Sequence, residues 1–273
     1  MKTETKDTVL SQESLANRRT ILDIIHRGGA SHISSSFSAV EILRAMYRAV
    51  DIDKIRSNSE DRDRVIISKG HCAAAVYTVM HDYGLISDEY LESYHTNGSL
   101  LSGLVSHFVP YVEHSTGSLG HGLSVGLGVA IGLKARGFDS ASVYVIVGDA
   151  EMHEGSNWEA FMLAGHVGLG NLCVIIDNNG FGAIGGTDEC CSLEPLKDKL
   201  ESFGFATYEA DGHDEDEVYS VIRQSRSAGH PVGIICKTIK GKGVSFMEGD
   251  NVWHYRPPNK EAYAKMVLEL ERL

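Results

Sequence analysis

The chain has 273 residues, of which 42% are hydrophobic, so it is long enough to bury a substantial core in one large domain. Its formal charge of −12, from 37 acidic and 25 basic residues, disfavours a general nucleic-acid-binding surface, which requires a basic patch. The sequence has neither an apolar run of about eighteen residues nor a secretory signal, so we expect a soluble, cytoplasmic protein without membrane association.

Cysteine usage and linker composition favour a single domain without disulfides. The five cysteines are odd in number and lack Cys-x-x-Cys spacing, so neither a disulfide framework nor a zinc site is indicated. The five prolines are few and the 29 glycines are dispersed, so no flexible linker divides the chain. We expect residues 1–12 to form a flexible N-terminal segment and residues 13–273 to form one domain.

Short β-branched runs alternate with helical patterns along the chain. The predicted strands are Val65–Ile67, Val143–Val147, Leu172–Ile176 and Val232–Thr238. The predicted helices are Ser38–Val50, Ala73–Tyr83, Leu123–Arg136, Trp158–Gly168, Asp216–Ser227 and Glu261–Leu273. This alternation predicts an α/β fold with a doubly wound, open parallel sheet, helices on both faces, and ligands at the carboxyl ends of the strands.

Chemically distinctive residues follow each predicted strand. His71 follows the first strand, Asp149 the second, Asn179 the third, and a Lys-Gly-Lys-Gly turn at residues 240–243 the fourth. Gly148 lets the backbone approach a phosphate, and Asp149 and Asn179 offer the hard oxygen ligands that Mg²⁺ prefers. A simple turn after a strand is the commoner use of Gly-Asp and Asn-Asn dipeptides, so neither dipeptide alone decides between the two.

A glycine-rich stretch at residues 116–122 leads into the predicted helix Leu123–Arg136. Backbone amides at a glycine-rich helix entrance attract anions, which is compatible with phosphate binding. Close helix packing would equally account for Gly126 and Gly128.

The spacing of the acidic and amide residues resembles a known cofactor motif. Asp149 and Asn179 are thirty positions apart, similar to the thiamine diphosphate motif of the transketolase family, Gly-Asp-Gly followed after about thirty residues by Asn. Further blocks that resemble this family are Gly70-His71, residues 115–120, Glu154-Gly155, Trp158-Glu159-Ala160 and residues 240–248. The resemblance extends from about Arg18 to His254. It implies that residues 13–273 form the thiamine diphosphate-binding fold, as its diphosphate-binding domain.

The resemblance also implies roles for individual residues. Asp149, Asn179 and the carbonyl of Phe181 would hold Mg²⁺, or Ca²⁺ or Mn²⁺ in its place. The residues that would contact the cofactor are His71, Gly117, Ser118, Leu119, Gly148, Asp149, Ala150, Glu151, Asn179 and His254. The residues expected to serve catalysis are His32, His71, His254, Glu154 and His107. His32 and His71 would hydrogen-bond sugar hydroxyls and assist proton transfer.

Two of these residues have distinct expectations. Glu154 matches a family glutamate that couples cofactor sites across a subunit interface, and a simple helix N-terminal acid is its alternative role. His107 lies three residues after Leu104, where the family's Gly-His-Pro places a substrate histidine. Either a shifted loop returns the His107 imidazole to the site, or the pocket is more apolar and accepts a different sugar.

Other departures from the family pattern surround the substrate more than the cofactor. Gly-Asp-Gly is Gly-Asp-Ala here, and Ala150 is tolerable only if its backbone does not require positive φ. The family's Ser-Gly-His-Pro-Gly reads Ala-Ser-His-Ile-Ser at residues 30–34, and the glutamine of the glycine-rich turn is His121. Thiamine diphosphate is therefore predicted more firmly than ordinary pentose phosphates, and branched or sulfonated sugar analogues would fit such a pocket.

The family's aminopyrimidine-activating glutamate belongs to a second domain, which would begin after Leu273. We therefore expect the N-terminal subunit of a split transketolase, inactive alone, which transfers a two-carbon ketol unit from a ketose phosphate or analogue to an aldose. Its partner would carry the pyrimidine-binding and C-terminal domains, and two copies of each chain would form a heterotetramer. A flat apolar surface around residues 160–169 would then be exposed on the isolated chain.

Other interpretations remain. A noncatalytic or regulatory thiamine diphosphate-binding subunit is the alternative from a different class, and the retention of Asp149 and Asn179 argues against it. Other thiamine enzymes share the Gly-Asp and Asn motif but not the blocks around His71 and residues 240–243. A nicotinamide-binding protein is disfavoured because no Gly-x-Gly-x-x-Gly follows the first strand.

Overall fold

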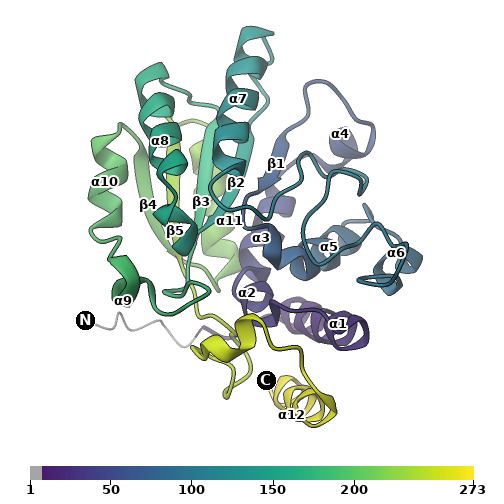
Figure 1. Ribbon diagram of the computed structural model, residues 1–273. Helices are drawn as coiled ribbons and strands as arrows, with labels where there is room; N and C mark the ends of the chain where they lie inside the picture. The colour runs from purple at the N-terminus through teal and green to yellow at the C-terminus, as the bar shows by residue number, and fades with distance from the viewer. Residues whose placement is uncertain (1–7) are drawn as a thin grey trace.

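The computed structural model describes residues 8–273, so most of the segment predicted to be flexible, residues 1–12, lies outside the described residues. A five-stranded sheet forms the centre of the molecule, with the strand order β1-β2-β3-β5-β4 (Figure 1). All neighbouring strands are parallel. The strands are β1 (Arg64–Ile67), β2 (Val143–Gly148), β3 (Leu172–Asn178), β4 (Ala206–Asp211) and β5 (Val232–Lys237).

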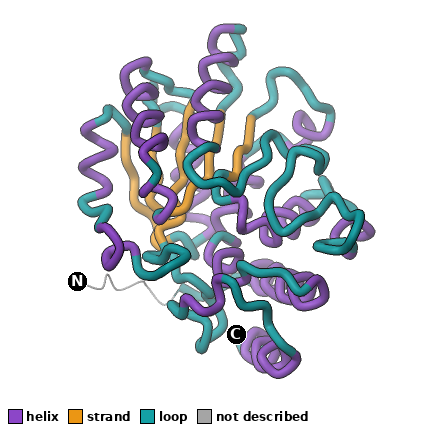
Figure 2. Tube along the Cα trace, in the orientation of Figure 1, coloured by secondary structure: helices purple, strands orange, loops and turns teal. Residues whose placement is uncertain are grey.

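Helices cover both faces of this sheet, and loops gather at its lower end in the view shown (Figures 1 and 2). One face carries α7 (Gly122–Ala135), α8 (Gly155–Val167) and α10 (Leu196–Ser202). The other face carries α1 (Gln12–Gly28), α3 (Val40–Ala49), α5 (Ala73–Asp82) and α11 (Glu215–Ser225). The remaining helices are α2 (Ile33–Ser38), α4 (Ile52–Arg56), α6 (Asp88–Glu92), α9 (Thr187–Cys191), α12 (Lys260–Leu270) and the short 3₁₀ helices η1 (Gly70–Cys72), η2 (Ala150–His153) and η3 (Asn251–His254).

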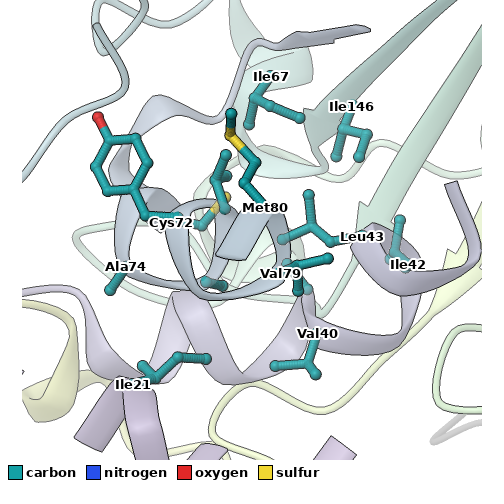
Figure 3. Close-up of a cluster of buried hydrophobic side chains, with 14 of the residues drawn as sticks. Ile21, Val40, Ile42, Leu43, Ile67, Cys72, Ala74, Val79, Met80 and Ile146 are labelled. Atoms are coloured by element: carbon teal, nitrogen blue, oxygen red, sulfur yellow. The ribbon is translucent and has the colours of Figure 1, made fainter. Parts of the chain in front are cut away.

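Alternating side chains of the central strands feed two separate hydrophobic cores. In β2, Val143, Val145 and Val147 pack against α7 and α8, whereas Tyr144 and Ile146 pack on the opposite side. The core on the side of Tyr144 and Ile146 is the larger one. Figure 3 shows side chains of α1, α3 and α5 that meet Ile67 and Ile146 of the sheet in this core. Every residue of β1 and β2 is buried, and apart from Arg64 at the start of β1 their sequences are continuous apolar runs, as is typical of strands covered on both faces.

The strand register brings the ends of β2 and β3 together. Gly148 of β2 is paired with Asp177 of β3, and the Asp149 N–H donates to the Asp177 carbonyl at 3.1 Å. Asp149 and Asn179 therefore leave the sheet side by side. The predicted doubly wound parallel sheet is confirmed. Across residues 8–273, none of the helices combines the length and apolar character needed to traverse a lipid bilayer.

Candidate functional site

A cavity of about 180 Å³ lies at the carboxyl ends of β1, β2 and β3. It is closed on other sides by the start of α2 and by η3, so segments far apart in the sequence meet there. The lining residues are His32, Ser35, Lys69, His71, Leu104, Gly117, Leu119, Gly148, Asp149, Ala150, Glu151, Asn179, Phe181, Gly182, Ala183, His254 and Tyr255.

Asp149 is a buried carboxylate at the end of β2 and offers the first of two candidate oxygen ligands in this cavity. Its Oδ1 accepts the Ala150 N–H at 2.7 Å and its Oδ2 accepts the Gly180 N–H at 2.5 Å, which fixes the side chain. Burial, with the nearby Asp177 carboxylate, raises the pKa of Asp149 to about 7. A cation in the cavity would favour the ionised form, because positive charge offsets the cost of burying the carboxylate.

Asn179 provides the second oxygen, just beyond β3. Its Oδ1 accepts the Phe181 N–H at 3.1 Å, and its Nδ2 donates to the Ser38 hydroxyl at 3.3 Å. Residues 8–273 hold no cluster of three or more His, Cys, Asp or Glu side chains able to bind a metal. One carboxylate, one amide oxygen and nearby carbonyls form a partial oxygen set, which fits a hard cation that takes its other ligands from a diphosphate and water.

Lys240 supplies a buried positive charge on the same side of the cavity. Its Nζ donates to the Gly182 carbonyl at 3.0 Å, to Asn251 Oδ1 at 2.9 Å and to His254 Nδ1 at 3.0 Å. In the described part of the chain, no carboxylate forms an ion pair with it. Burial, with repulsion from Lys69, lowers the pKa of Lys240 to about 8. A buried ammonium bonded only to neutral acceptors fits an anionic ligand such as a diphosphate.

Three imidazoles face one another across the cavity. Ring centroids lie 5.4 Å apart for His32 and His71, 5.0 Å for His32 and His254, and 5.6 Å for His71 and His254. His32 adopts φ 68°, an uncommon conformation for a non-glycine residue, and its N–H donates to the His254 carbonyl at 2.9 Å. That contact holds the start of α2 against η3.

The three imidazoles are neutral at physiological pH. Burial and the nearby lysines lower the pKa of His71 well below its usual value and that of His254 to about 3. Burial, with Lys240 nearby, also lowers the pKa of His32. Each ring therefore has one N–H donor and one nitrogen acceptor, the combination needed to bind hydroxyl groups and move protons.

The glycine-rich loop before α7 presents its backbone to the cavity. Gly117 has φ 149°, and a β-carbon there would lie 2.8 Å from Leu104 Cδ1, so the position requires glycine. The buried Glu151 carboxylate accepts the Gly120 N–H at 2.8 Å, the Gly148 N–H at 3.2 Å and the Ser68 hydroxyl. Glu151 thus lines the cavity, but its carboxylate braces the two glycine-containing loops.

Comparison with known proteins identifies this arrangement. Residues 11–268 match the family model described as the thiamine diphosphate binding domain of transketolase. The chain belongs to the transketolase family. This confirms the family and the fold class predicted from the sequence.

Known transketolase sequences show how the chain relates to one-chain and split members. It is 39% identical over 268 residues to one subunit of the apulose-4-phosphate transketolase of Phocaeicola vulgatus, covering 96% of this chain and 93% of that one. It is 35% identical to the SqwG subunit of the 6-deoxy-6-sulfo-D-fructose transketolase of a Clostridium species, covering 96% of both chains. The crystal structure of Campylobacter jejuni transketolase superposes with a TM-score of 0.83 at 26% identity, and the match covers 95% of this chain but 42% of that one.

The structure places most of the residues expected from the transketolase resemblance in the cavity, but not three of them. His107 is exposed, its Nδ1 lies 2.6 Å from the Ser115 hydroxyl, and its ring stacks 4.2 Å from Phe108. The Ser118 side chain is exposed between two residues that do line the cavity. Glu154 is exposed at the start of α8, a position compatible with an interface role but outside the cavity.

The backbone explains why Leu104 rather than His107 reaches the site. The Val105 N–H donates to the Gly70 carbonyl at 3.0 Å, and the Thr116 N–H donates to the Val105 carbonyl at 3.1 Å. These bonds anchor Leu104 beside the cavity, so no loop shift restores the imidazole. At Ala150, which lies in η2, φ is not positive, and alanine is tolerated in the Gly-Asp-Ala motif.

Several lining residues were absent from the sequence-based site. Lys69 lines the cavity and directly precedes the block Gly70-His71, but its side chain was not assigned a role. Lys240 lies in the block at residues 240–248 and contacts the lining residues Gly182 and His254, and it was not assigned a role either. Ser35 and Tyr255 flank the assigned His32 and His254, and only the folding of α2 onto η3 brings them into the cavity.

Proposed function

We propose that this chain is the cofactor-binding subunit of a two-chain transketolase, which transfers a two-carbon ketol unit from a ketose phosphate or analogue to an aldose. The observation that carries the proposal is one cavity lined by a partial oxygen set and three neutral histidines, with the buried Lys240 bonded to the lining residues Gly182 and His254. A purely regulatory subunit would have no need for the histidines.

Thiamine diphosphate and Mg²⁺ are the proposed cofactors. Asp149, Asn179 and the Phe181 carbonyl would hold the metal, and the backbone of residues 117–119 would hold the diphosphate, with the Lys240 ammonium behind Gly182 and His254 supplying positive charge. When bound, the cofactor supplies the nucleophilic carbon and the electron sink for ketol transfer. The protein supplies position and electrostatic complementarity, since the buried Lys240 ammonium meets the diphosphate charge where water does not screen it.

The histidines are proposed to bind the sugar and move protons. Because His32 and His71 are neutral, each can accept a hydrogen bond from one hydroxyl and donate one to another oxygen. His254 Nδ1 accepts from Lys240, so its Nε2–H is left as a donor to the ligand. If His32 or His71 takes a proton from a sugar hydroxyl, it becomes charged near the buried lysines, which favours rapid return of the proton.

Two apolar surfaces support an assembly with other chains. Ile184, Val252 and Tyr255 are exposed near the cavity mouth, with Ile184 89% exposed. We propose that the partner's pyrimidine-binding domain covers them. A second surface on α8 includes Met162 and Leu163, 57% and 43% exposed. This surface lies within the region, residues 160–169, where an apolar surface was expected. We propose that a second copy of this chain covers it in a heterotetramer. We also propose a cytoplasmic location.

The substrate is proposed to be an unusual sugar. Leu104 places a hydrocarbon side chain, 42% exposed, where a hydroxyl of an ordinary ketose phosphate would need a hydrogen-bond partner. The similar proteins named above act, by their names, on apulose 4-phosphate and on a sulfonated fructose. A branched or sulfonated ketose analogue is the donor class that these observations favour.

Native mass spectrometry of the tagged chain from its own host tests the proposal. We expect a partner of about 300 residues, bound thiamine diphosphate and Mg²⁺. The Asp149→Ala variant should keep the partner and lose the cofactor, whereas Asp139→Ala, an exposed site before β2 at the opposite end of the strands, should keep both. A wild-type chain with neither partner nor cofactor would refute the proposal.

A further inference from the structure

We propose that Lys69, Asp177 and Ser38 form a buried relay that fixes the amide of Asn179, so that its oxygen faces the cation. The three are positioning residues, because they act through Asn179. The inference rests on the proposed metal site and adds a device that sets its affinity.

The relay begins with an ion pair sealed inside the protein. The Lys69 ammonium donates to Asp177 Oδ2, and the side chains are 1% and 0% exposed. Lys69 also donates to the Ser35 carbonyl at 3.3 Å, and Asp177 Oδ1 accepts the Thr238 hydroxyl. Because Lys69 donates to one oxygen of Asp177 and Thr238 donates to the other, both oxygens of this carboxylate act as hydrogen-bond acceptors.

The Ser38 hydroxyl connects the Lys69–Asp177 ion pair to Asn179. Its hydroxyl lies 2.7 Å from Asp177 Oδ2 and 3.1 Å from the Ser35 carbonyl oxygen. Both of these neighbours are acceptors, whereas the Lys69 ammonium, 3.5 Å from the Ser38 oxygen, is a donor to it. The single hydroxyl proton must therefore point to one of the two acceptors, and the shorter bond to the carboxylate is the stronger. In either case no proton remains for a third neighbour. The Ser38 oxygen can therefore only accept a hydrogen bond from Asn179.

The amide of Asn179 has one orientation that satisfies these neighbours. Its Nδ2 donates to the Ser38 hydroxyl at 3.3 Å, which leaves Oδ1 to accept the Phe181 N–H at 3.1 Å and to face the cavity. A flipped amide would bring Oδ1 against the Ser38 oxygen and point N–H groups at the Phe181 N–H and at the cation. The chain of bonds thus selects the metal-binding orientation before the metal arrives.

The Ser38→Ala variant tests the relay, and α2 contains its matched control. Ser36 is also fully buried on this helix, and within the described residues its hydroxyl has no hydrogen-bond partner. Mg²⁺ would be titrated by calorimetry into the full chain with its partner subunit, at saturating thiamine diphosphate. We expect Ser38→Ala to weaken Mg²⁺ binding by about 10- to 100-fold, and Ser36→Ala to leave it within about twofold.

A second substitution separates orientation from general loosening. In an Asn179→Asp background both terminal atoms of the side chain are oxygens, so rotating the group by 180° changes nothing. One of these oxygens then faces the Ser38 oxygen, whose proton already points to Asp177 or to the Ser35 carbonyl. Adding Ser38→Ala there should leave Mg²⁺ affinity within about twofold or improve it. Equal losses in both backgrounds, or no loss in either, would overturn the relay. Absence of Mg²⁺ and cofactor binding by the wild-type complex would refute the proposed function itself.

Discussion

Lys240 is a buried cation whose hydrogen-bond partners are all neutral. Its pKa of about 8 follows from burial and from repulsion by Lys69, and no compensating carboxylate pairs with it in the described part of the chain. A bound diphosphate would favour the charged form, so the free protein takes up a proton, or retains one, as the ligand binds. The affinity for thiamine diphosphate is therefore tied to the protonation of one side chain.

We predict that this affinity falls as pH rises above about 8, where Asp149, whose pKa is about 7, is already mostly ionised and Lys240 loses its charge. The charged form dominates below about 8 and is lost above it, so the dissociation constant should rise by up to about tenfold per pH unit beyond that point. Fluorescence titration of the cofactor at constant Mg²⁺ measures it. The Lys240→Met variant should bind more weakly at pH 7 and show no such slope. A wild-type profile parallel to the variant's would contradict the assignment.

Leu104 is predicted to determine donor preference. The Leu104→His variant should raise kcat/KM for an ordinary pentulose phosphate relative to a branched analogue by about tenfold, because an imidazole can pair with the hydroxyl that leucine leaves unbonded. Steady-state kinetics on the reconstituted complex with both donors measure the ratio. Leu100→His, an exposed position in the same loop outside the cavity, is the control and should leave the ratio unchanged.

At the scale of elements, a second buried charge network connects three helices to the loop that carries Lys240. Arg18 of α1 donates to Glu41 of α3 and to the Lys242 carbonyl, the latter at 2.9 Å. His213, just before α11, contacts Glu41 Oε2 at 2.9 Å and accepts the Ile239 N–H at 2.8 Å. The network supports the loop around the cofactor lysine without lining the cavity.

Removing the carboxylate of this network should destabilise the fold strongly. Glu41→Ala leaves the fully buried Arg18 guanidinium without its counter-ion, so we expect the free energy of unfolding to fall by about 3–5 kcal/mol. Urea denaturation measures the change. The matched control is Asp216→Ala, which removes an 83% exposed partner of Arg48 and should cost at most about 1 kcal/mol. Similar losses in both variants would contradict the importance of burial.

Lowering the pH should destabilise the fold through the same network. Despite the cost of burial, Arg18 and His213 lower the pKa of Glu41 to about 2 from an ordinary value of 4.5. A carboxylate with a depressed folded-state pKa contributes stability above its unfolded-state pKa, and this contribution is lost as pH falls from about 4.5 towards 2.

Among the strands, the sequence predicted those whose residues are almost all buried and missed the half-buried one. The four predicted strands coincide with β1, β2, β3 and β5, whose apolar runs follow from two-sided burial. Strand β4 was missed because it is an edge strand with mostly half-buried, partly polar side chains. Helix α1 was not predicted either, although Ser11 caps its start and Gly29, at φ 62°, ends it.

The sequence could predict site residues that belong to a recognisable local pattern. It could not predict residues that only long-range contacts in the folded chain bring to the site. Asp149 and Asn179 follow strands, and their thirty-residue spacing resembles the transketolase motif, so the sequence pointed to them. His107 lies outside the cavity because a backbone hydrogen bond at Val105 anchors Leu104 there instead. Residue spacing in the sequence does not reveal this hydrogen bond. The relay through Ser38 depends on a contact between residues more than one hundred positions apart, so it required the structure.

At the scale of the whole molecule, α8 presents an uncovered apolar surface. We predict that a Met162→Lys, Leu163→Lys double variant reduces the proposed assembly of four chains to one copy of each subunit, because charged side chains resist burial in an interface. Native mass spectrometry measures the change. The isolated chain should keep its melting temperature, since both positions are exposed. Leu268→Lys on α12, 51% exposed and away from α8, is the control and should leave the assembly intact.

The open cavity mouth also has a consequence for how the activity would be controlled. A cavity whose other wall is proposed to come from a separate chain works only while the two chains are associated, so turnover depends on the abundance of both. Dilution would dissociate the two chains and so abolish activity without unfolding either of them. An excess of this subunit would hold cofactor in unproductive half-sites, so unequal synthesis of the two chains would lower flux more than an equal reduction of both.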